Sequence, residues 1–432
     1  MQTLHTRRVA GPQQVAAGRS RRAAVVVRAA SRFADVAQAP PDPILGVSEA
    51  FKRCTDPKKL NLGVGAYRDE NLKPMVLDVV RKAEAKIFAA NKDHEYLPIE
   101  GLDTFRKATI DLLLGAGHPA IKDDRVAVIQ SLSGTGSLRV GAAFIARFLP
   151  KGTTVYISNP TWGNHRNIFA DENVEWKYYR YFDADTVGLD FKGMVEDLKA
   201  APAGSVVLLH GCAHNPTGVD PTADQWAAIA DLCKERNLLP FFDVAYQGFA
   251  TGDLDKDAFA PRLFVDKGLE VMVAQSYSKN LGLYGERVGA MSIVTSDKDA
   301  ATRCLSQLKR LARPLYSNPP THGARIAAEI VNDQELFTEW KAEMMGMAGR
   351  IARVRGELQA ALEAKYPSKD WSFVTRQIGM FSFTGLTPAQ VDNMTNKHAI
   401  YMTRDGRISL AGLNSAKVDY LAEAMIDSVR NH

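Results

Sequence analysis

Short apolar runs rich in β-branched and aromatic residues alternate with longer amphipathic stretches between about residues 75 and 300. The apolar runs have the length and composition of buried strands. They occupy residues 126–130, 153–158, 206–210, 239–243, 271–275 and 289–294. Strands that alternate with helices in this way predict a largely parallel sheet with helices on both faces.

One of the intervening helices can be placed from its cap and its apolar positions. Thr222 is a good N-cap residue, and Trp226, Ile229, Ala230 and Cys233 follow it at helical spacing, so they share one face. After about residue 347 the sequence is helix-rich and charged, with short strands. A chain of 432 residues has room for a second lobe there.

The first 30 residues differ in composition from the rest. They contain six arginines and no acidic residue, whereas the whole chain has a net charge of only +5, so the body is close to neutral. This composition, with serine and alanine, predicts an organelle transit peptide over residues 1–30. The VVV run at 25–27 is too short for a secretory signal, and residues 25–30 resemble the end of algal chloroplast transit peptides. Mitochondrial import and a basic tail or nucleic-acid arm are the alternatives.

The remaining composition is that of a globular protein, with 46% hydrophobic and 24% charged residues. A proline-rich segment, APPDP at 39–43, predicts an extended N-terminal arm over residues 31–45. No apolar run approaches the ~20 residues that cross a bilayer. The four cysteines form no CxxC pair, which argues against a zinc site. The body therefore predicts neither a nucleic-acid nor a membrane partner.

Polar side chains follow four of the predicted strands. The segments are SGTGS at 133–137, HNPTG at 214–218, DVAY at 243–246 and SYSK at 276–279. Ligands of open α/β sheets bind outside the carboxyl ends of the strands. We therefore expect hydroxyls, an amide, a carboxylate, a phenol and an amine to meet in one site.

The SGTGS segment lies between a strand and an apolar helical run over residues 138–149. Glycines let backbone amides turn towards an anion, hydroxyls add donors, and a helix N-terminus favours negative charge. The spacing is not that of a dinucleotide fingerprint, because Arg139 occupies the third glycine position. A structural turn is the alternative, but Ser276 and Arg287 offer further phosphate ligands.

Lys279 follows a buried strand, where a lowered pKa would let its amine attack carbonyls. Its surroundings, SYSKNLGLYGERVG at 276–289, resemble the pyridoxal-attachment motif of class I aminotransferases at every defined position. Further segments resemble the eukaryotic-type aspartate aminotransferases in order and spacing. They are NLGVGAYR at 61–68, YLP at 96–98, TWGNH at 161–165, HNPTG at 214–218, RPLYSNPP at 313–320 and GRIS at 406–409.

This resemblance covers residues 32–432 and implies the α/β fold of pyridoxal-phosphate transferases of fold type I. A large domain over residues 75–346 would hold a mostly parallel seven-stranded sheet. A smaller α+β domain would combine residues 46–74 and 347–432. The implied cofactor is pyridoxal 5'-phosphate.

The resemblance also implies site residues. Lys279 would attach the cofactor and move the substrate's proton as base and then acid, and Asp243 would pair with the pyridine nitrogen, so that the ring accepts electrons. Asn215 and Tyr246 would bind the phenolic oxygen, and Trp162 would stack on the ring. The phosphate ligands would be Ser133, Gly134, Thr135, Ser276 and Arg287, with Tyr96 reaching in from a partner subunit. His165 and His210 would support these groups from behind, although core histidines are the alternative.

Two arginines would select the substrate. Arg407 would bind the α-carboxylate, and Arg313 would reach from the neighbouring subunit to the side-chain carboxylate. Gly65 would offer backbone contact, while Trp162 and Asn215 would also touch the substrate. The implied reaction is a ping-pong transfer of the amino group between L-aspartate/2-oxoglutarate and oxaloacetate/L-glutamate, in a homodimer with shared active sites.

Three other functions are weighed against this one. An aminotransferase of the same fold that prefers aromatic substrates is the nearest, and Arg313 favours the dicarboxylate interpretation. A pyridoxal enzyme that decarboxylates or eliminates is opposed by the paired arginines. A nucleotide-binding module would need a fingerprint that the segment around Gly134 lacks.

Overall fold

The computed structural model describes residues 11, 31–40 and 45–432. It divides into two units, Met1–Pro41 and Asp42–His432. In the first unit, residues 32–35 form a turn. The predicted transit peptide lies outside the described residues except for Gly11, as do residues 41–44 of the predicted arm.

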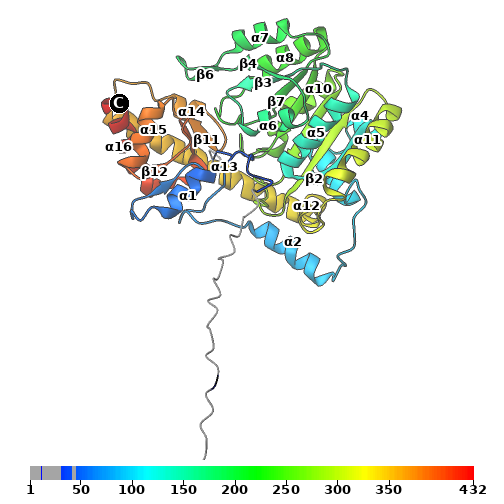
Figure 1. The fold of residues 1–432 in the computed structure, drawn as a ribbon, viewed down its shortest axis with the longest axis horizontal. Coiled ribbons are helices and arrows are strands. Elements are labelled where there is room, and N and C mark those ends of the chain that lie inside the picture. The colour runs from blue at the N-terminus through cyan, green and yellow to red at the C-terminus, as the bar shows by residue number, and fades with distance from the viewer. Residues whose placement is uncertain (1–10, 12–30, 41–44) are drawn as a thin grey trace, which may run out of the picture. The chain divides into compact units, whose positions relative to one another are not determined.

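The second unit is built around a seven-stranded sheet with the order β2-β10-β9-β8-β7-β3-β4 (Figure 1). The strands are β2 (Val126–Leu132), β3 (Val155–Asn159), β4 (Trp176–Arg180), β7 (Val206–His210), β8 (Leu239–Val244), β9 (Val271–Ser276) and β10 (Val288–Val294). All six strands predicted from apolar runs are confirmed. The seventh, β4, was not predicted because its sequence, WKYYR, is mostly exposed at the sheet edge and forms no apolar run.

Strand direction decides which segments share an edge of this sheet. β3 pairs in parallel with β4 and β7, and β8 pairs in parallel with β7 and β9. Only β10 runs against its neighbours, β9 and β2. The carboxyl ends of the other six strands therefore lie at one edge, and the start of β10 lies at that same edge.

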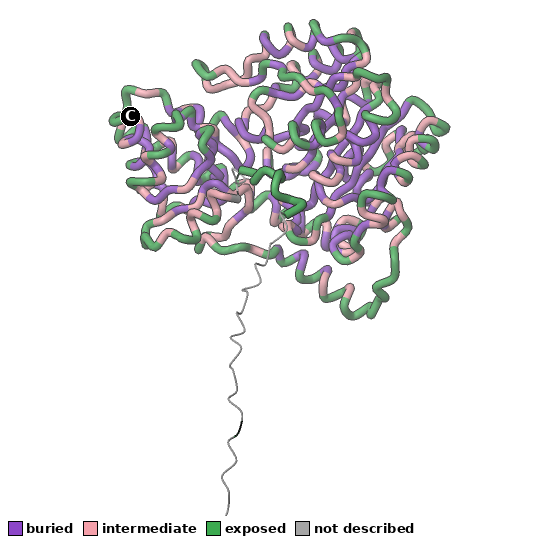
Figure 2. The backbone as a smooth tube through the Cα atoms, viewed as in Figure 1, coloured by how far each residue is buried: buried purple, intermediate pink, exposed green. Residues whose placement is uncertain are grey.

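Alternate strand residues face opposite layers of helices, as the period of two requires. In β7, Val206 and Leu208 belong to one apolar cluster, whereas Val207 and Leu209 belong to the other. The first cluster includes residues of α5 (Ser133–Phe148), α6 (Asn164–Asp171) and α11 (Lys298–Tyr316). The second includes residues of α3 (Asp103–Leu114), α7 (Phe191–Ala200), α8 (Ala223–Glu235), α10 (Phe259–Asp266) and α12 (His322–Asn332). Both faces of the predicted sheet are thus covered, and Figure 2 shows buried residues along the chain where Figure 1 draws the strands of the sheet.

The helix predicted after Thr222 is confirmed as α8. Thr222 accepts a hydrogen bond from the Gln225 amide, and the Gln225 side chain accepts one from the Thr222 amide, so the two form a capping box. Trp226 and Ile229 on its apolar face are buried. The other helices are α1 (Leu45–Arg53), α2 (Asp78–Ala89), α4 (Pro119–Lys122), α9 (Leu254–Asp257), α13 (Gln334–Lys365), α14 (Phe373–Arg376), α15 (Pro388–Asn396), the 3-10 turn η1 (Leu410–Gly412) and α16 (Ser415–Asn431).

Three two-stranded sheets complete the second unit. β1 (Leu60–Asn61) pairs with β12 (Ile400–Tyr401), β5 (Phe182–Asp183) with β6 (Gly188–Leu189), and β11 (Phe381–Phe383) with β13 (Arg407–Ser409). The 32-residue helix α13 crosses the predicted boundary between residues 346 and 347, so that boundary would fall inside a continuous helix. No helix in the described part of the chain is both long and apolar enough to cross a membrane.

Candidate active site

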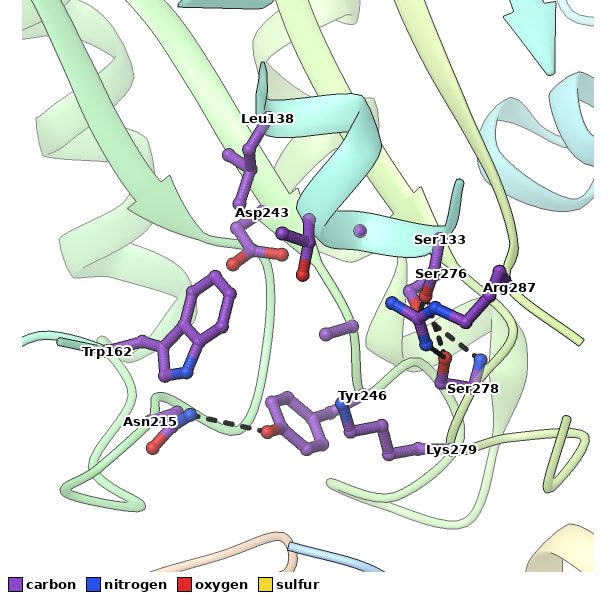
Figure 3. Close-up of a pocket in the computed structure, with 13 residues that line it drawn as sticks. Ser133, Leu138, Trp162, Asn215, Asp243, Tyr246, Ser276, Ser278, Lys279 and Arg287 are labelled. Carbon is purple, nitrogen blue, oxygen red and sulfur yellow. Dashed lines mark hydrogen bonds between the residues drawn. The ribbon is translucent and has the colours of Figure 1, made fainter. Parts of the chain in front are cut away.

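The carboxyl edge of the sheet borders a cavity formed by segments that are far apart in the sequence (Figure 3). It is lined by Ser133, Gly134, Thr135, Leu138, Trp162, Asn215, Asp243, Ala245, Tyr246, Ser276, Ser278, Lys279 and Arg287. Ten residues of this lining were predicted to bind the cofactor. The sequence interpretation missed Leu138, Ala245 and Ser278, although Ser278 was recognisable as a hydroxyl directly before Lys279.

Three serines and an arginine form a hydroxyl cluster on one side of the cavity. The Ser133 hydroxyl lies 2.9 Å from that of Ser276 and 2.7 Å from that of Ser278. Arg287 Nη1 donates to the Ser278 hydroxyl at 3.5 Å. The side chains converge because β2 and β9 end here and β10 starts here. Hydroxyl and guanidinium donors in this arrangement suit an anion such as phosphate.

The helix next to this cluster starts earlier than predicted. The SGTGS segment was expected to be a loop before a helix over residues 138–149, but α5 begins at Ser133. Ser133 has a φ of +61° and Gly134 packs against Ser276, so the chain turns directly from β2 into the helix. The first turn of a 16-residue helix therefore presents its free amides to the cavity.

Asp243 lies on another side of the cavity and is held by a histidine. His165 Nε2 donates to Asp243 Oδ2 at 3.0 Å, and Thr161 contacts the other nitrogen of that histidine at 2.8 Å. Burial by itself would raise the pKa of Asp243. The hydrogen bond from His165 and the electrostatic effect of the nearby Lys279 outweigh it and lower the pKa. The carboxylate therefore stays ionised, and its other oxygen, Oδ1, is buried without a hydrogen-bond partner among the described residues.

His210 lies behind this pair rather than in the cavity lining. It is buried, its ring centroid is 5.3 Å from that of His165, and burial lowers its pKa to about 3. Its neutral Nδ1 accepts a hydrogen bond from the Asn215 amide at 3.2 Å. The structure therefore brings both predicted supporting histidines against cavity residues.

The Lys279 side chain reaches into the cavity beside the Tyr246 ring, with 5.4 Å from Nζ to the ring centroid (Figure 3). Removal from water lowers the pKa of its amine, and Arg287 and Arg407 act in the same direction, while Asp243 opposes them. A lowered pKa increases the neutral fraction of the amine, which is the form that acts as a base or nucleophile.

A second polar group connects the cavity to the C-terminal strands. Asn215 Nδ2 donates to the Tyr246 hydroxyl at 3.4 Å, and Arg407 Nη1 donates to Asn215 Oδ1 at 3.2 Å. Arg407 Nη2 donates to the Gly63 carbonyl at 2.7 Å, and its guanidinium lies 4.3 Å from the Phe381 ring centroid. Arg407 is buried, and its Nε has no hydrogen-bond partner within the described part of the chain. The predicted arginine thus keeps an unused donor next to the cavity residue Asn215.

Gly65 lies against the Phe381 ring, at a position where only a glycine fits. A β-carbon at this position would lie 2.7 Å from the Phe381 ring, which supports Arg407. A side chain would therefore displace either the ring or the segment that carries Gly65.

Four predicted site residues are not in the cavity lining. Gly65 and Arg407 belong to the neighbouring group around Asn215 and Phe381, whereas Tyr96 and Arg313 lie elsewhere on the described chain. Tyr96 is 83% exposed, and Arg313 is exposed near the end of α11, where its guanidinium donates to the Ser317 hydroxyl. The described chain by itself therefore brings together all the predicted residues except these two.

The arrangement combines three chemical capacities. It offers an anion site, an ionised carboxylate with a free oxygen, and a lysine amine with a lowered pKa. Comparison with known proteins shows which family uses them. The profile described as "Aminotransferase class I and II" matches residues 57–425.

The chain belongs to the class I and II aminotransferases.

Members of known activity resemble this aminotransferase closely. The chloroplastic aspartate aminotransferase of Arabidopsis thaliana is 64% identical over 93% of this chain and 88% of its own length. The mitochondrial aspartate aminotransferase P2 of Lupinus angustifolius is 64% identical over 92% of this chain and 88% of its own. A solved aromatic-amino-acid aminotransferase from Burkholderia pseudomallei, with pyridoxal phosphate covalently bound, is 45% identical with a TM-score of 0.89, covering 92% of this chain and all of that one.

Proposed function

We propose that this aminotransferase is an aspartate aminotransferase, which reversibly converts L-aspartate and 2-oxoglutarate into oxaloacetate and L-glutamate. The observation that carries the proposal is the single cavity that combines the Lys279 amine, the ionised Asp243 and the hydroxyl cluster next to the buried Arg407. The relatives that are 64% identical are both aspartate aminotransferases.

The residues of the cavity fit pyridoxal phosphate. Asp243 Oδ1 is a buried acceptor to which no described residue donates, as a protonated ring nitrogen requires. Ser133, Gly134, Thr135, Ser276 and Arg287 would hold the phosphate, Asn215 and Tyr246 the phenolic oxygen, and Trp162 the ring face. When bound, this cofactor supplies an aldehyde for the amino group and a ring that accepts electrons from the substrate's α-carbon.

Lys279 has two tasks in this proposal. Its amine would hold the cofactor. Once free, it would take the proton from the substrate's α-carbon as a base and pass it to the cofactor as an acid, and the second half of the reaction would run the same transfer in reverse. The lowered pKa suits the base, since a neutral amine can accept a proton. Oxaloacetate leaves before 2-oxoglutarate enters, which makes the kinetics ping-pong.

Arg407 would bind the α-carboxylate of both substrates. Nη1 and Nη2 each carry a second hydrogen beside the one given to Asn215 or Gly63, and these two hydrogens can form the planar two-bonded pair that guanidinium makes with carboxylates. Gly65, Trp162 and Asn215 would touch the same substrate, since Gly65 packs on the Phe381 ring beneath Arg407 and the other two line the cavity.

The side-chain carboxylate would be bound by Arg313 from a second copy of the chain, and Tyr96 of that copy would reach the phosphate. Both residues are exposed, outside the cavity of their own chain. Large apolar side chains nearby in the sequence are also exposed, with Phe88 at 87% and Leu315 at 42%. Such exposure supports a protein interface, and we propose a homodimer with shared active sites.

Two further predictions belong to this proposal. Residues 46–74 and 347–432 would form the small domain, and residues 75–346 would form the large one. The β1–β12 pair supports this division because it joins Leu60 and Asn61 to a C-terminal strand, and the β11–β13 pair lies wholly within the C-terminal part.

Residues 1–30 would direct import into chloroplasts, because their end resembles algal transit peptides. Relatives named chloroplastic and mitochondrial are equally similar to this chain, so the comparisons do not decide between the two organelles. A fluorescent fusion of residues 1–30 tests the assignment, and its accumulation in mitochondria would overturn import into chloroplasts.

The experiment that tests the function combines a substitution with chemical trapping. Lys279→Ala should abolish transamination of aspartate while the protein stays folded, and the exposed Lys58→Ala should leave the rate unchanged. Borohydride reduction of the wild-type enzyme should fix the cofactor on the peptide that contains Lys279. An adduct elsewhere would refute the assignment.

An amino-donor panel tests the substrate class. Aspartate and glutamate should be preferred over phenylalanine and tyrosine. The solved aromatic-amino-acid enzyme makes aromatic preference the second candidate, and a higher kcat/KM for aromatic donors would favour it.

A further inference from the structure

Tyr284 connects two parts of the site that have no other hydrogen bond between them among the described residues. Its hydroxyl accepts a hydrogen bond from the Tyr67 amide at 2.9 Å, across 217 positions of sequence. Tyr284 lies in the turn between Lys279 and Arg287, and Tyr67 lies in the NLGVGAYR segment that also contains Gly63 and Gly65.

The Tyr284 backbone ties this contact to the phosphate side of the cavity. Its carbonyl accepts a hydrogen bond from Arg287 Nη1 at 2.9 Å, and the same nitrogen donates to Ser278. The turn itself is closed by the Gly282 amide, which donates to the Lys279 carbonyl at 3.0 Å. A shift of Tyr284 would therefore move the residues around both the lysine and the arginine.

The other end of the contact belongs to the substrate side. Arg407 holds the Gly63 carbonyl, and the Arg68 amide donates to the Ala411 carbonyl at 3.0 Å. The segment is thus attached to β13 at one end and to the turn η1 at the other, and among the hydrogen bonds of the described residues Tyr284 alone links it to the Lys279 turn. The Tyr67 ring is buried against Phe249, with 6.3 Å between the ring centroids.

We infer that Tyr284 is a positioning residue, whose hydroxyl holds the segment of residues 63–68 in the conformation that receives the substrate. The inference rests on the proposed function, since it assigns Arg407 and Gly65 to the substrate. Without the hydroxyl, the Tyr67 amide loses its acceptor and the segment must be ordered when the substrate binds. That ordering weakens binding. The Lys279 proton transfer is spared, because the turn closed by the Gly282 amide still places Lys279.

The test is Tyr284→Phe, which removes one oxygen and keeps the ring. KM for aspartate should rise about fivefold while kcat changes less than about twofold, as expected for the loss of one neutral hydrogen bond that acts in binding. Hydrogen exchange of a peptide spanning residues 62–68 should be faster in the variant holoenzyme. Succinate, a dicarboxylate that cannot react, should slow that exchange less than in the wild type.

Tyr179→Phe is the matched control, because the hydroxyl of this buried residue of the edge strand β4 donates to the Leu208 carbonyl at 3.0 Å. It should lower Tm without changing KM or the exchange of residues 62–68. The inference would be overturned if KM and the hydrogen exchange of residues 62–68 were unchanged in Tyr284→Phe. It would also be overturned if kcat fell as much as KM rose, and if these changes paralleled the drop in Tm in both variants. The proposed function is tested separately, by aspartate turnover and by the borohydride adduct on Lys279, both measured in the wild-type enzyme.

Discussion

At the scale of single residues, the buried Asp243 and the partly buried Asp220 have opposite pKa shifts. Asp243 has a histidine donor and nearby positive charge, which lower its pKa despite burial. Asp220 accepts hydrogen bonds from the Ala213 and His214 amides at 2.6 and 2.8 Å. Burial still raises the pKa of Asp220 to about 6, and Asp257 adds to this rise. A carboxylate stays ionised when a cationic partner accompanies it, and backbone amides alone do not suffice here.

This difference predicts a pH-dependent stability. The folded pKa of Asp220 is above the unfolded value of about 3.9, so folding takes up a proton between these values. The stabilising contribution is complete below about pH 4 and lost as the pH rises through about 6, amounting to about 3 kcal/mol at most. Asp220→Asn does not titrate there. The Tm of the wild type minus that of the variant should therefore fall from about pH 4 to about pH 7.

Differential scanning calorimetry across that pH range measures the effect. Asp299→Asn, at an exposed position in the first turn of α11, controls for the loss of a negative charge. A Tm difference for Asp220→Asn that is the same at both ends of the range would contradict the prediction.

At the scale of elements, β10 matters most because it runs against the rest of the sheet. Its direction brings Arg287 to the edge where the other strands end. The strand fits between β2 and β9 only with a glycine at its second position. A β-carbon on Gly289 would lie 2.4 Å from the Gln275 carbonyl oxygen and 2.6 Å from the Ser133 carbonyl carbon.

Gly289→Ala should therefore displace the start of α5 and weaken the hydroxyl cluster. We expect a loss of stability of about 1–3 kcal/mol from overpacking. The variant should also lose its yellow cofactor absorbance during gel filtration, while the wild type retains it.

Gly356→Ala provides the comparison, because a β-carbon at this exposed position of α13 meets nothing within 4 Å. It should stabilise the protein by about 0.5–1 kcal/mol and leave the cofactor bound. Equal cofactor retention in both variants would show that the contact with Ser133 is unimportant for the site.

At the scale of the whole molecule, one chain supplies all but two of the predicted site residues. Arg313 and Tyr96 lie outside the cavity that their own chain forms. If a second copy supplies them, each site requires two subunits, and inactive variants with different defects can complement each other.

Mixing Lys279→Ala with Arg313→Asp should restore part of the aspartate activity after subunit exchange. In the mixed dimer, one site lacks both residues and the other contains both. Arg313→Asp alone should reduce kcat/KM for aspartate at least about tenfold, because one charged pair contributes about 1.5–3 kcal/mol. Aromatic donors should lose much less. No recovery despite demonstrated exchange would place Arg313 in the site of its own subunit.

The sequence by itself determined the elements and the chemistry of the site. A continuous apolar run indicates a strand that is buried on both faces, and such runs predicted six of the seven strands of the sheet. The edge strand β4 lacked that signal because solvent reaches it. The motif around Lys279 and the polar segments at strand ends predicted ten residues of the cavity lining, because ligand sites in such sheets lie where the strands end.

Only the tertiary structure decided which groups meet. The hydrogen bond between His165 and Asp243 joins residues 78 positions apart, and that between Tyr67 and Tyr284 joins residues 217 apart. The reversed direction of β10, the start of α5 at Ser133 and the absence of Arg313 from the cavity of its own chain were likewise decided by packing. Periodicity and spacing describe neighbours along the chain, whereas pKa values and hydrogen-bond partners depend on neighbours in space.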